Sequence, residues 1–416
     1  MGLLLATVLI FPLSVDASIS RVNGLGTTAG KPALTYLRVR NEIIAAVITG
    51  CGADPDAVRG VRENAEAPGR CALILRADNG QVLRKLTPGS DVSGDIQMTY
   101  PLMGGVAVYP NSGTVPSDRA YLGDIAGQLW RIDLRSPDPN NWKIAVAWPP
   151  QDAVARQGYR LGRSIQSTPS LALRRDGRLA VVFGTGDEGT AVEDTASTVV
   201  SFSDDLKLSE SGSLEFDVTP NWVMPLRQGE VFRGESVIYE RSAFFTSLTE
   251  TTNDDEQCAA AIPRVYAVDY IQTTARYDTN DGRTLDVLPR LPPIKTEGGG
   301  IVTDGIALIL PSGLSVDGLS IVRSPSCASE QAPTTEMIFN YASAQRGVQT
   351  SELLIERKEG DAVDESVDET LVRRGGQDVS ISVTGNGALD QPVQSGDRGM
   401  APFPRQVLYW GTSLGE

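Results

Sequence analysis

Short apolar runs in which hydrophobic and polar positions alternate recur along this chain of 416 residues. In the clearest unit, residues 120–134, one run ends at Gly123-Asp124 and a second run follows a glycine-containing turn. A second unit covers residues 179–186 and 197–202. This alternation predicts half-buried antiparallel strands. No segment carries a sustained helical stripe, so we expect little helix.

Weaker copies of the unit lie at 44–50 with 71–76, at 243–249 with 264–269, and at 408–414. In the last copy, Tyr409-Trp410-Gly411-Thr412 echoes Phe183-Gly184-Thr185. Turn signals separate the runs, and Asp78-Asn79-Gly80 and Asp176-Gly177 are typical of short hairpins. The strand residues Tyr121, Trp130, Tyr266 and Trp410 are expected in the core.

Repeated hairpins of this kind predict an all-β fold. Each unit leaves a hydrophobic face that a neighbouring unit must cover, and radial packing of four-stranded blades covers it with few exposed edges. We therefore predict that residues 1–416 form a single β-propeller domain, similar in shape to quinoprotein dehydrogenases. It would have about six or seven blades of roughly 40 to 60 residues each. A two-sheet sandwich is the structural alternative.

Three polar stretches interrupt the pattern and predict long loop insertions: 53–69, 253–261 and 345–404. The third is the most polar and contains an acidic run at 359–365, so we expect a polar, acidic insertion or flexible segment there. Loops on a rigid scaffold commonly carry binding surfaces.

The charge and composition exclude several classes of function. A net charge of −15 and a pI near 4.6 disfavour nucleic acid and anionic membrane surfaces as partners. The chain has no histidine, which rules out Ser-His-Asp and Cys-His hydrolases and any His-ligated metal or haem. We identify no catalytic residue and expect a protein that is not an enzyme.

Four cysteines, Cys51, Cys71, Cys258 and Cys327, lack metal-binding or redox spacing and favour disulfides. We favour Cys51 with Cys71 and Cys258 with Cys327, which implies an oxidising compartment. The N-terminal apolar run, 3–13, is equally consistent with a signal peptide and with a buried strand of a fragment. It is too short to span a bilayer, and no later segment is apolar enough.

One acidic cluster has the ligand chemistry of a calcium loop. Asp278, Asn280 and Asp281 lie close together, with Asp286 a little further on, and calcium prefers oxygen ligands of this kind. The glycine at 282 comes one position too early for an EF-hand, so a solvated hairpin turn is the alternative. Calcium is the one cofactor that the sequence suggests.

The string from Tyr121 to Asp133 resembles the Tyr-x-Gly-Asp-x-x-Gly-x-Leu-Trp signature of PilY-type type IV pilus proteins. The matching residues are Tyr121, Gly123, Asp124, Gly127 and Trp130. Downstream, Gly184-Thr185-Gly186 and the segment 265–269 resemble the next two blades of that family's C-terminal propeller, and the likeness covers about residues 15–330.

The resemblance implies an exported protein that passes through the periplasm to the cell surface and the pilus. Its expected roles are pilus assembly, control of retraction and surface adhesion. Its expected partners are minor pilins or the pilus tip complex, and a host or abiotic surface. Relatives carry a calcium loop near the signature strand. In the matching stretch here, 111–118, only Asn111 and Asp118 offer an amide or carboxylate oxygen, so an ordinary turn is the alternative. A quinoprotein-like dehydrogenase and a generic extracellular binding propeller are the alternatives.

Overall fold

Strands make up nearly all of the regular structure. The computed structural model describes residues 26, 30–53, 69–94, 96–111, 115–149, 163–186, 197–208, 214–239, 241–250, 261–273, 277–278, 284–291, 302–303, 305–310, 314–323, 335–343, 347–356 and 380–383. Over these residues there are four sheets of four strands, one sheet of five strands and one two-stranded hairpin. The single helical element described is a 3-10 turn, η2 (Pro139–Asn141). The all-β prediction is confirmed.

The larger sheets follow one another along the chain, and we number them sheets 1 to 5. Sheet 1 contains β1 (Ala33–Val39), β2 (Glu42–Gly50), β3 (Ala72–Arg76) and β4 (Val82–Leu86). Sheet 2 contains β5 (Ala107–Tyr109), β6 (Arg119–Gly123), β7 (Leu129–Asp133) and β8 (Lys143–Trp148). Sheet 3 contains β9 (Ser170–Leu173), β10 (Leu179–Gly184), β11 (Thr198–Leu208) and β12 (Leu214–Pro225).

The last two sheets continue the same order. Sheet 4 contains β13 (Glu230–Tyr239), β14 (Ser242–Glu250), β15 (Ala261–Asp269), β19 (Ala307–Ile309) and β18 (Val302–Thr303). Sheet 5 contains β20 (Leu314–Arg323), β21 (Thr335–Ser343), β22 (Gly347–Glu356) and β23 (Ser380–Val383). Between β15 and β18 lies the small hairpin of β16 (Tyr277–Asp278) and β17 (Thr284–Leu285).

The strand pairs expected from the sequence are present and antiparallel. β6 pairs with β7, so that Gly123 lies opposite Leu129, and β10 pairs with β11, so that Gly184 lies opposite Val199. The weaker units pair as β2 with β3 and β14 with β15. The Asp78-Asn79-Gly80 turn joins β3 to β4, and Gly80 has the positive φ of 71° that such a turn favours.

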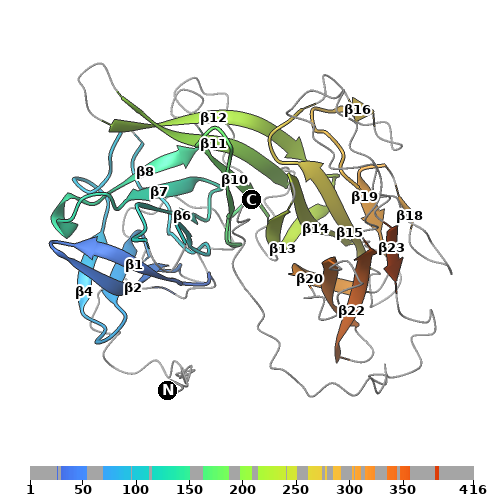
Figure 1. The fold of residues 1–416 in the computed structure, drawn as a ribbon, viewed down its shortest axis with the longest axis horizontal. Coiled ribbons are helices and arrows are strands. Elements are labelled where there is room, and N and C mark those ends of the chain that lie inside the picture. Colours follow the sequence, from blue (N-terminus) through green and yellow to red (C-terminus); the bar gives the residue numbers. More distant parts are fainter. Residues whose placement is uncertain are drawn as a thin grey trace, which may run out of the picture.

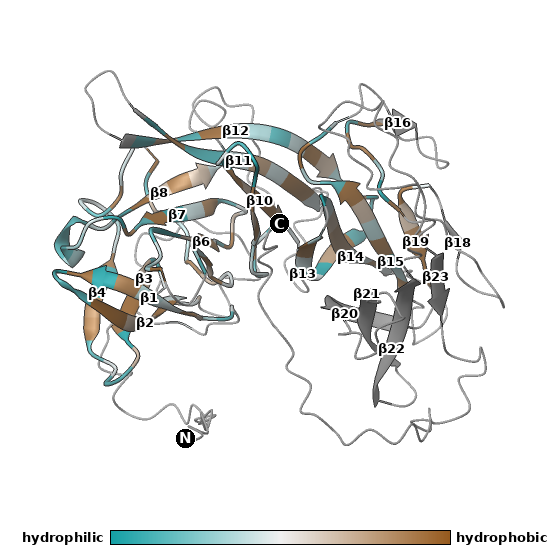
Figure 2. Ribbon diagram, in the orientation of Figure 1, coloured by the Kyte–Doolittle hydropathy of each residue, from teal (hydrophilic) through white to brown (hydrophobic). Residues whose placement is uncertain are grey.

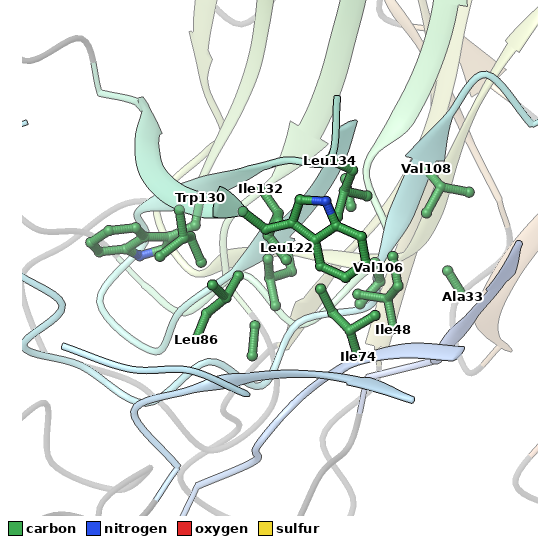
Figure 3. Packing of buried hydrophobic residues seen from close by; sticks show 14 of the residues in the cluster. Ala33, Ile48, Ile74, Leu86, Val106, Val108, Leu122, Trp130, Ile132 and Leu134 are labelled. Atoms are coloured by element: carbon green, nitrogen blue, oxygen red, sulfur yellow. The ribbon is translucent and has the colours of Figure 1, made fainter. Parts of the chain in front are cut away.

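Successive sheets pack face to face and share their hydrophobic cores. One core lies between sheets 1 and 2, where Ile48, Ile74 and Leu86 share a cluster with Leu122 and Trp130 (Figure 3). A second core joins sheets 2 and 3, and a third joins sheets 3 and 4. Sheets 2 and 3 are therefore buried on both faces, which explains why their strands lack polar residues at many alternate positions.

The five sheets are arranged radially. The first strands of sheets 1 to 5 contact one another in sequence, from β1 to β5, β9, β13 and then β20. Sheets 1 and 5 lie at the two ends of an arc in the described residues (Figure 1). Blade-like sheets whose first strands gather along one inner line are typical of propellers.

Part of the stretch 345–404, expected as a polar, acidic insertion or flexible segment, forms strands in the structure. β22 lies within it as a central strand of sheet 5, between β21 and β23. The polar first half of β22 conceals the strand, because Val348 is its only apolar residue before Leu353, and Leu353 to Ile355 stand together instead of alternating. The N-terminal run 3–13, the stretch 54–68, the loop 253–260 and the copy at 408–414 lie outside the described residues.

Candidate functional site

The signature residues form the turn between β6 and β7. Asp124 follows directly after β6 and is completely buried. Its Oδ1 accepts hydrogen bonds from the backbone N–H groups of Ala126 and Gln128 at 2.9 and 2.8 Å. Its Oδ2 accepts a bond from the indole N–H of Trp130 at 2.9 Å. One carboxylate thus holds both the turn and the buried Trp130 in the next strand, β7.

Two glycines permit this turn. Gly127 has a φ of 89°, a left-handed conformation that side chains rarely adopt. Gly123 ends β6 where a Cβ would collide with Ile165, on the segment that leads into sheet 3. The spacing of Gly123, Asp124, Gly127 and Trp130 is therefore explained by backbone geometry, close packing and one buried acceptor.

Burial raises the pKa of Asp124 from 3.8 to about 7, although the indole and backbone donors act in the opposite direction. A carboxyl group with such a pKa is a common sign of an acid-base catalyst. Here, however, both oxygens accept hydrogen bonds from the motif itself, and the side chain is not exposed to a substrate. The arrangement is that of a structural anchor.

A second buried carboxylate, Asp204 on β11, joins sheets 2 and 3. The phenol of Tyr121 donates a hydrogen bond to its Oδ2, and the guanidinium of Arg131 forms an ion pair with its Oδ1 at 2.8 Å. Tyr121 and Asp204 are completely buried, and Arg131 is nearly so. Burial, followed by the negative charge of Asp204, raises the pKa of Tyr121 well above its usual value, so the tyrosine remains the donor.

The β11–β12 hairpin also lays an aromatic ring against the arginines of sheet 2. The guanidinium of Arg131 lies 3.8 Å from the centre of the Phe216 ring, and those of Arg135 and Arg119 lie at 4.7 and 5.0 Å. Burial of Arg119 opposes its charged form, but its hydrogen bond to Asp118 and the negative charges nearby outweigh burial and raise its pKa. Cation–π contacts of this kind stabilise by about 0.5–2 kcal/mol each.

The Gly184-Thr185-Gly186 segment also has one glycine at a close contact between sheets, here sheets 3 and 4, and one glycine with a positive φ. A Cβ on Gly184 would collide with the ring of Phe232 on β13. Thr185 bonds to Thr198 on the neighbouring strand, both between hydroxyls at 3.0 Å and through the backbone. Gly186 has a φ of 103°.

Two more buried carboxylates, both in sheet 4, act as hydrogen-bond acceptors within the fold. Asp269 ends β15 and accepts hydrogen bonds from the backbone N–H groups of Ile271 and Gln272, and it pairs with Arg290 at 2.7 Å. Glu230 begins β13 and accepts a hydrogen bond from the Tyr266 hydroxyl at 2.7 Å. Asp269 stands in the part of the sequence that resembles the family, whereas Glu230 carried no sequence signal.

The predicted metal ligands are not brought together among the described residues. The carboxylate of Asp118 is bound by Arg119 at 2.7 Å, and Asn111 is the last described residue before a gap. Asp278 lies opposite Thr284 in the β16–β17 hairpin, and a hairpin turn was the alternative to a calcium loop there. Asp286 is exposed. Asn280 and Asp281 lie outside the described residues. No described set of three or more acidic or cysteine side chains could hold a metal, and calcium stays a prediction.

Cys51 and Cys71 form the first of the two expected disulfides, with their Cα atoms 5.3 Å apart. Cys51 directly follows β2, Cys71 directly precedes β3, and both are buried beside Leu73. Cys258 and Cys327 lie outside the described residues. Over the part of the chain that the structure describes, no helix has the length and hydropathy needed to cross a membrane.

The sequence missed Asp204, Arg131 and Phe216 as a group. Asp204 lies in phase with Phe202 on β11, so an inward-facing acidic residue in an apolar strand was the available signal. Nothing in the sequence indicated that Phe216, after the hairpin tip, would lie against arginines of another sheet.

Comparison with known proteins supports the resemblance noted from the sequence. No protein-family model matches this chain. Over 129 residues the chain is 31% identical to a protein of Xylella fastidiosa described as a type IV pilus biogenesis factor PilY1 homolog. This alignment covers 28% of the chain and 9% of that relative. The resemblance to the PilY-type family is confirmed over this part of the chain.

Solved structures were also compared. The C-terminal domain of Pseudomonas aeruginosa PilY1 superposes with a TM-score of 0.46 at 16% identity, covering 80% of this chain and 74% of that one. An exo-1,5-α-L-arabinanase from a bovine ruminal metagenomic library has a TM-score of 0.27 at 7% identity, covering 86% and 99%. With TM-scores below 0.5, neither adds to the argument for the fold, which stands on the sheets themselves.

Proposed function

We propose that this chain is a propeller-type domain of a type IV pilus-associated protein that acts by binding and not by catalysis. The observation that carries the proposal is the match to a relative named for type IV pilus biogenesis. The order of the signature residues from Tyr121 to Trp130 agrees with it, and in the structure these residues build one buried turn.

In this proposal the sheets are a rigid scaffold. Sheets 1 to 4 share continuous cores, and buried ion pairs such as Arg131 with Asp204 fix one sheet to the next. A closed ring of about six or seven blades would complete the scaffold. The connecting loops would then be the surfaces that recognise partners.

The partners that we propose are minor pilins or the pilus tip complex, together with a host or abiotic surface. Through them the protein would support pilus assembly, counter retraction and attach the cell. The Cys51–Cys71 disulfide supports export through the periplasm to the cell surface, because disulfides persist in oxidising compartments. The net charge of −15 opposes nucleic acid as a partner.

A role without catalysis is supported by how the buried acids are used. Asp124, Asp204 and Asp269 are fully buried, and each accepts hydrogen bonds from the fold. The chain also has no histidine, the commonest acid-base catalyst near neutral pH. The absorbance spectrum of the purified protein tests the dehydrogenase alternative, since a bound quinone would contradict the proposal.

The decisive experiment is deletion of the gene in its host. We expect loss of surface pili, measured as pilin in sheared surface fractions, and loss of twitching motility, measured as the width of the colony zone. Complementation with the wild-type gene should restore both, and it controls for effects on neighbouring genes. Unchanged surface pilin and motility in the deletion strain would reject the pilus association and leave a generic binding propeller.

A further inference from the structure

The turn between β9 and β10 holds one aspartate between two arginines at the end of sheet 3. The carboxylate of Asp176 pairs with the guanidinium of Arg174 at 2.8 Å and with that of Arg178 at 3.1 Å. Arg175, in the same turn, is exposed. β10, which follows the turn, is almost entirely hydrophobic (Figure 2). The turn thus contains three arginines and one aspartate, and it is positively charged in a chain whose net charge is −15.

The end of sheet 4 has the same arrangement of one aspartate and two arginines. Asp269, at the end of β15, is completely buried. Its Oδ2 pairs with the guanidinium of Arg290 at 2.7 Å and with that of Arg241, in the β13–β14 turn, at 3.4 Å. Arg241 has a φ of 68°, and residues held in this left-handed conformation without being glycine cluster at functional sites. One carboxylate again serves two guanidinium groups, so positive charge remains.

Hydrogen bonds join these two arginine clusters. Arg174 donates to the Ser203 hydroxyl on β11, and this hydroxyl donates to Oδ1 of Asn221 on β12 at 2.9 Å. The amide of Asn221 donates to the backbone oxygen of Tyr270 at 3.4 Å. The N–H of Tyr270 donates to the carbonyl of Arg241 at 3.1 Å. Tyr270 therefore lies between the arginines of sheet 3 and those of sheet 4.

Tyr270 contributes a hydroxyl that the fold does not use. Its side chain is only 8% exposed and belongs to the core between sheets 3 and 4. It is hydrogen-bonded through its backbone N–H and C=O groups. In the described part of the chain its hydroxyl has no hydrogen bond, although a buried tyrosine usually has a partner for this group.

The charges of both clusters act on this hydroxyl. Burial raises the pKa of Tyr270, and the positive charges of Arg241 and Arg174 act in the opposite direction. Their partners Asp269 and Asp176 act in the same direction as burial. Because a charge changes a pKa only from nearby, the hydroxyl lies within reach of the arginines of both sheets.

Two more donors at this junction lack an acceptor. The Nε–H groups of Arg174 and Arg241 are buried, and neither has a hydrogen-bond partner in the residues that the structure describes. A buried donor without an acceptor is costly. Guanidinium groups form their strongest hydrogen bonds with carboxylate and phosphate oxygens, so a second anion is the natural complement of these side chains.

We propose that Tyr270, Arg174 and Arg241 form a binding site for an oxyanion at the junction of sheets 3 and 4. The Tyr270 hydroxyl donates a hydrogen bond to the anion, and the two arginines supply the positive charge that their single aspartates leave unbalanced. Free phosphate and the carboxylate of an acidic peptide segment share this chemistry. The inference does not rest on the pilus association, so a deletion strain that keeps its pili leaves it standing.

The test is isothermal titration calorimetry of the full chain at constant ionic strength. Sodium phosphate and a hexaglutamate peptide are the two probes, and sodium chloride is the reference. Binding of phosphate alone identifies a free anion as the ligand, and binding of the peptide identifies an acidic segment. Tyr270→Phe should weaken the binding roughly tenfold, because it removes one hydrogen bond to a charged group. Its ring stays in the core, so the variant should fold like the wild type.

Arg174→Gln should weaken the binding by a similar factor, and Arg76→Gln is its matched control. Arg76 also pairs with an aspartate two residues away in a hairpin turn, Asp78 at 2.7 Å, but in sheet 1. Arg76→Gln should therefore bind as tightly as the wild type. The proposal is overturned if neither probe binds more tightly than chloride, or if Tyr270→Phe binds as the wild type does. Equal weakening by Arg174→Gln and Arg76→Gln would show general charge attraction and reject the site as well.

Discussion

At the scale of single residues, the buried acids of this protein organise the turns and the junctions between sheets. Asp124 lies inside a short motif, and the sequence indicated its position through the family resemblance. Its three N–H donors could not be read from the sequence, because they depend on the turn that Gly127 allows and on the orientation of Trp130. Asp204 was missed altogether because both of its partners, Tyr121 and Arg131, are distant in the sequence.

Asp124 should make stability depend on pH in an unusual direction. Its pKa is raised to about 7 by burial, so between about pH 4 and pH 7 the folded protein keeps a proton that the unfolded chain has released. The free energy of unfolding should therefore fall as the pH rises through this range, and level off above it. The contribution is on the order of 4 kcal/mol across the range.

Urea denaturation of the wild type and Asp124→Asn at several pH values between 4 and 8 measures this effect. The variant should lack that part of the pH dependence, and it should be less stable at low pH by about 1–3 kcal/mol, since an amide cannot accept all three N–H groups. Asp286→Asn, at an exposed aspartate, is the control and should follow the wild type. Parallel pH profiles for wild type and Asp124→Asn would contradict the prediction.

Removal of Asp204 should be among the most destabilising single changes in sheets 2 and 3. Asp204→Ala leaves the Arg131 charge buried and takes away the acceptor of the Tyr121 hydroxyl, so we expect a loss of roughly 3–5 kcal/mol in the free energy of unfolding. The neighbouring Asp205 is half-buried and its Oδ1 accepts from the Leu206 N–H. Asp205→Ala should therefore cost less than about 1 kcal/mol. Chemical denaturation compares the two, and similar losses would show that the buried pair is not the cause.

At the scale of elements, the hairpins could be predicted and one strand could not. Short apolar runs gave the positions of β6, β7, β10 and β14. The half-burial predicted from alternation does not hold for β6 and β10, which are buried throughout because they pack on both neighbouring sheets. β22 could not be predicted, because it pairs with a strand on each side while its own sequence gives little periodic signal. Backbone pairing of this kind depends on β21 and β23 and is not encoded in β22 alone.

The glycine at the end of β10 should be required for contact between sheets 3 and 4. Gly184→Ala places a methyl group where the ring of Phe232 lies, and overpacking of this kind costs about 1–3 kcal/mol. Phe232→Leu vacates part of that space, so the double variant should be more stable than the sum of the two single losses predicts. A double-mutant cycle measured by denaturation gives the coupling. Additive losses would indicate that the glycine acts through backbone freedom instead of packing.

At the scale of the whole molecule, the sequence indicates radial repetition but not the full set of blades. The repeated Gly-Asp and Gly-Thr strand ends predicted sheets that cover one another, and sheets 1 to 4 do so through three successive cores. The prediction of about six or seven blades stays a prediction, because five sheets lie in the described residues. The face of sheet 1 opposite its core aligns Leu34, Val47, Leu75 and Val82, and its exposed apolar residues are the structural feature that calls for a further sheet.

A charge placed on that face should distinguish a covered surface from an open one. If a closing sheet packs on Leu34, then Leu34→Glu buries a carboxylate among apolar groups, and the free energy of unfolding should fall by about 2–5 kcal/mol. Leu173→Glu changes a residue of the same type and similar exposure, 52% against 60%, at a site where no closing sheet is expected, and should shift stability by no more than about 0.5 kcal/mol. Thermal and urea denaturation of both variants gives the comparison. Equal, small effects would mean that the face of sheet 1 is open to water in the folded chain, and the ring would then have to end at its first sheet.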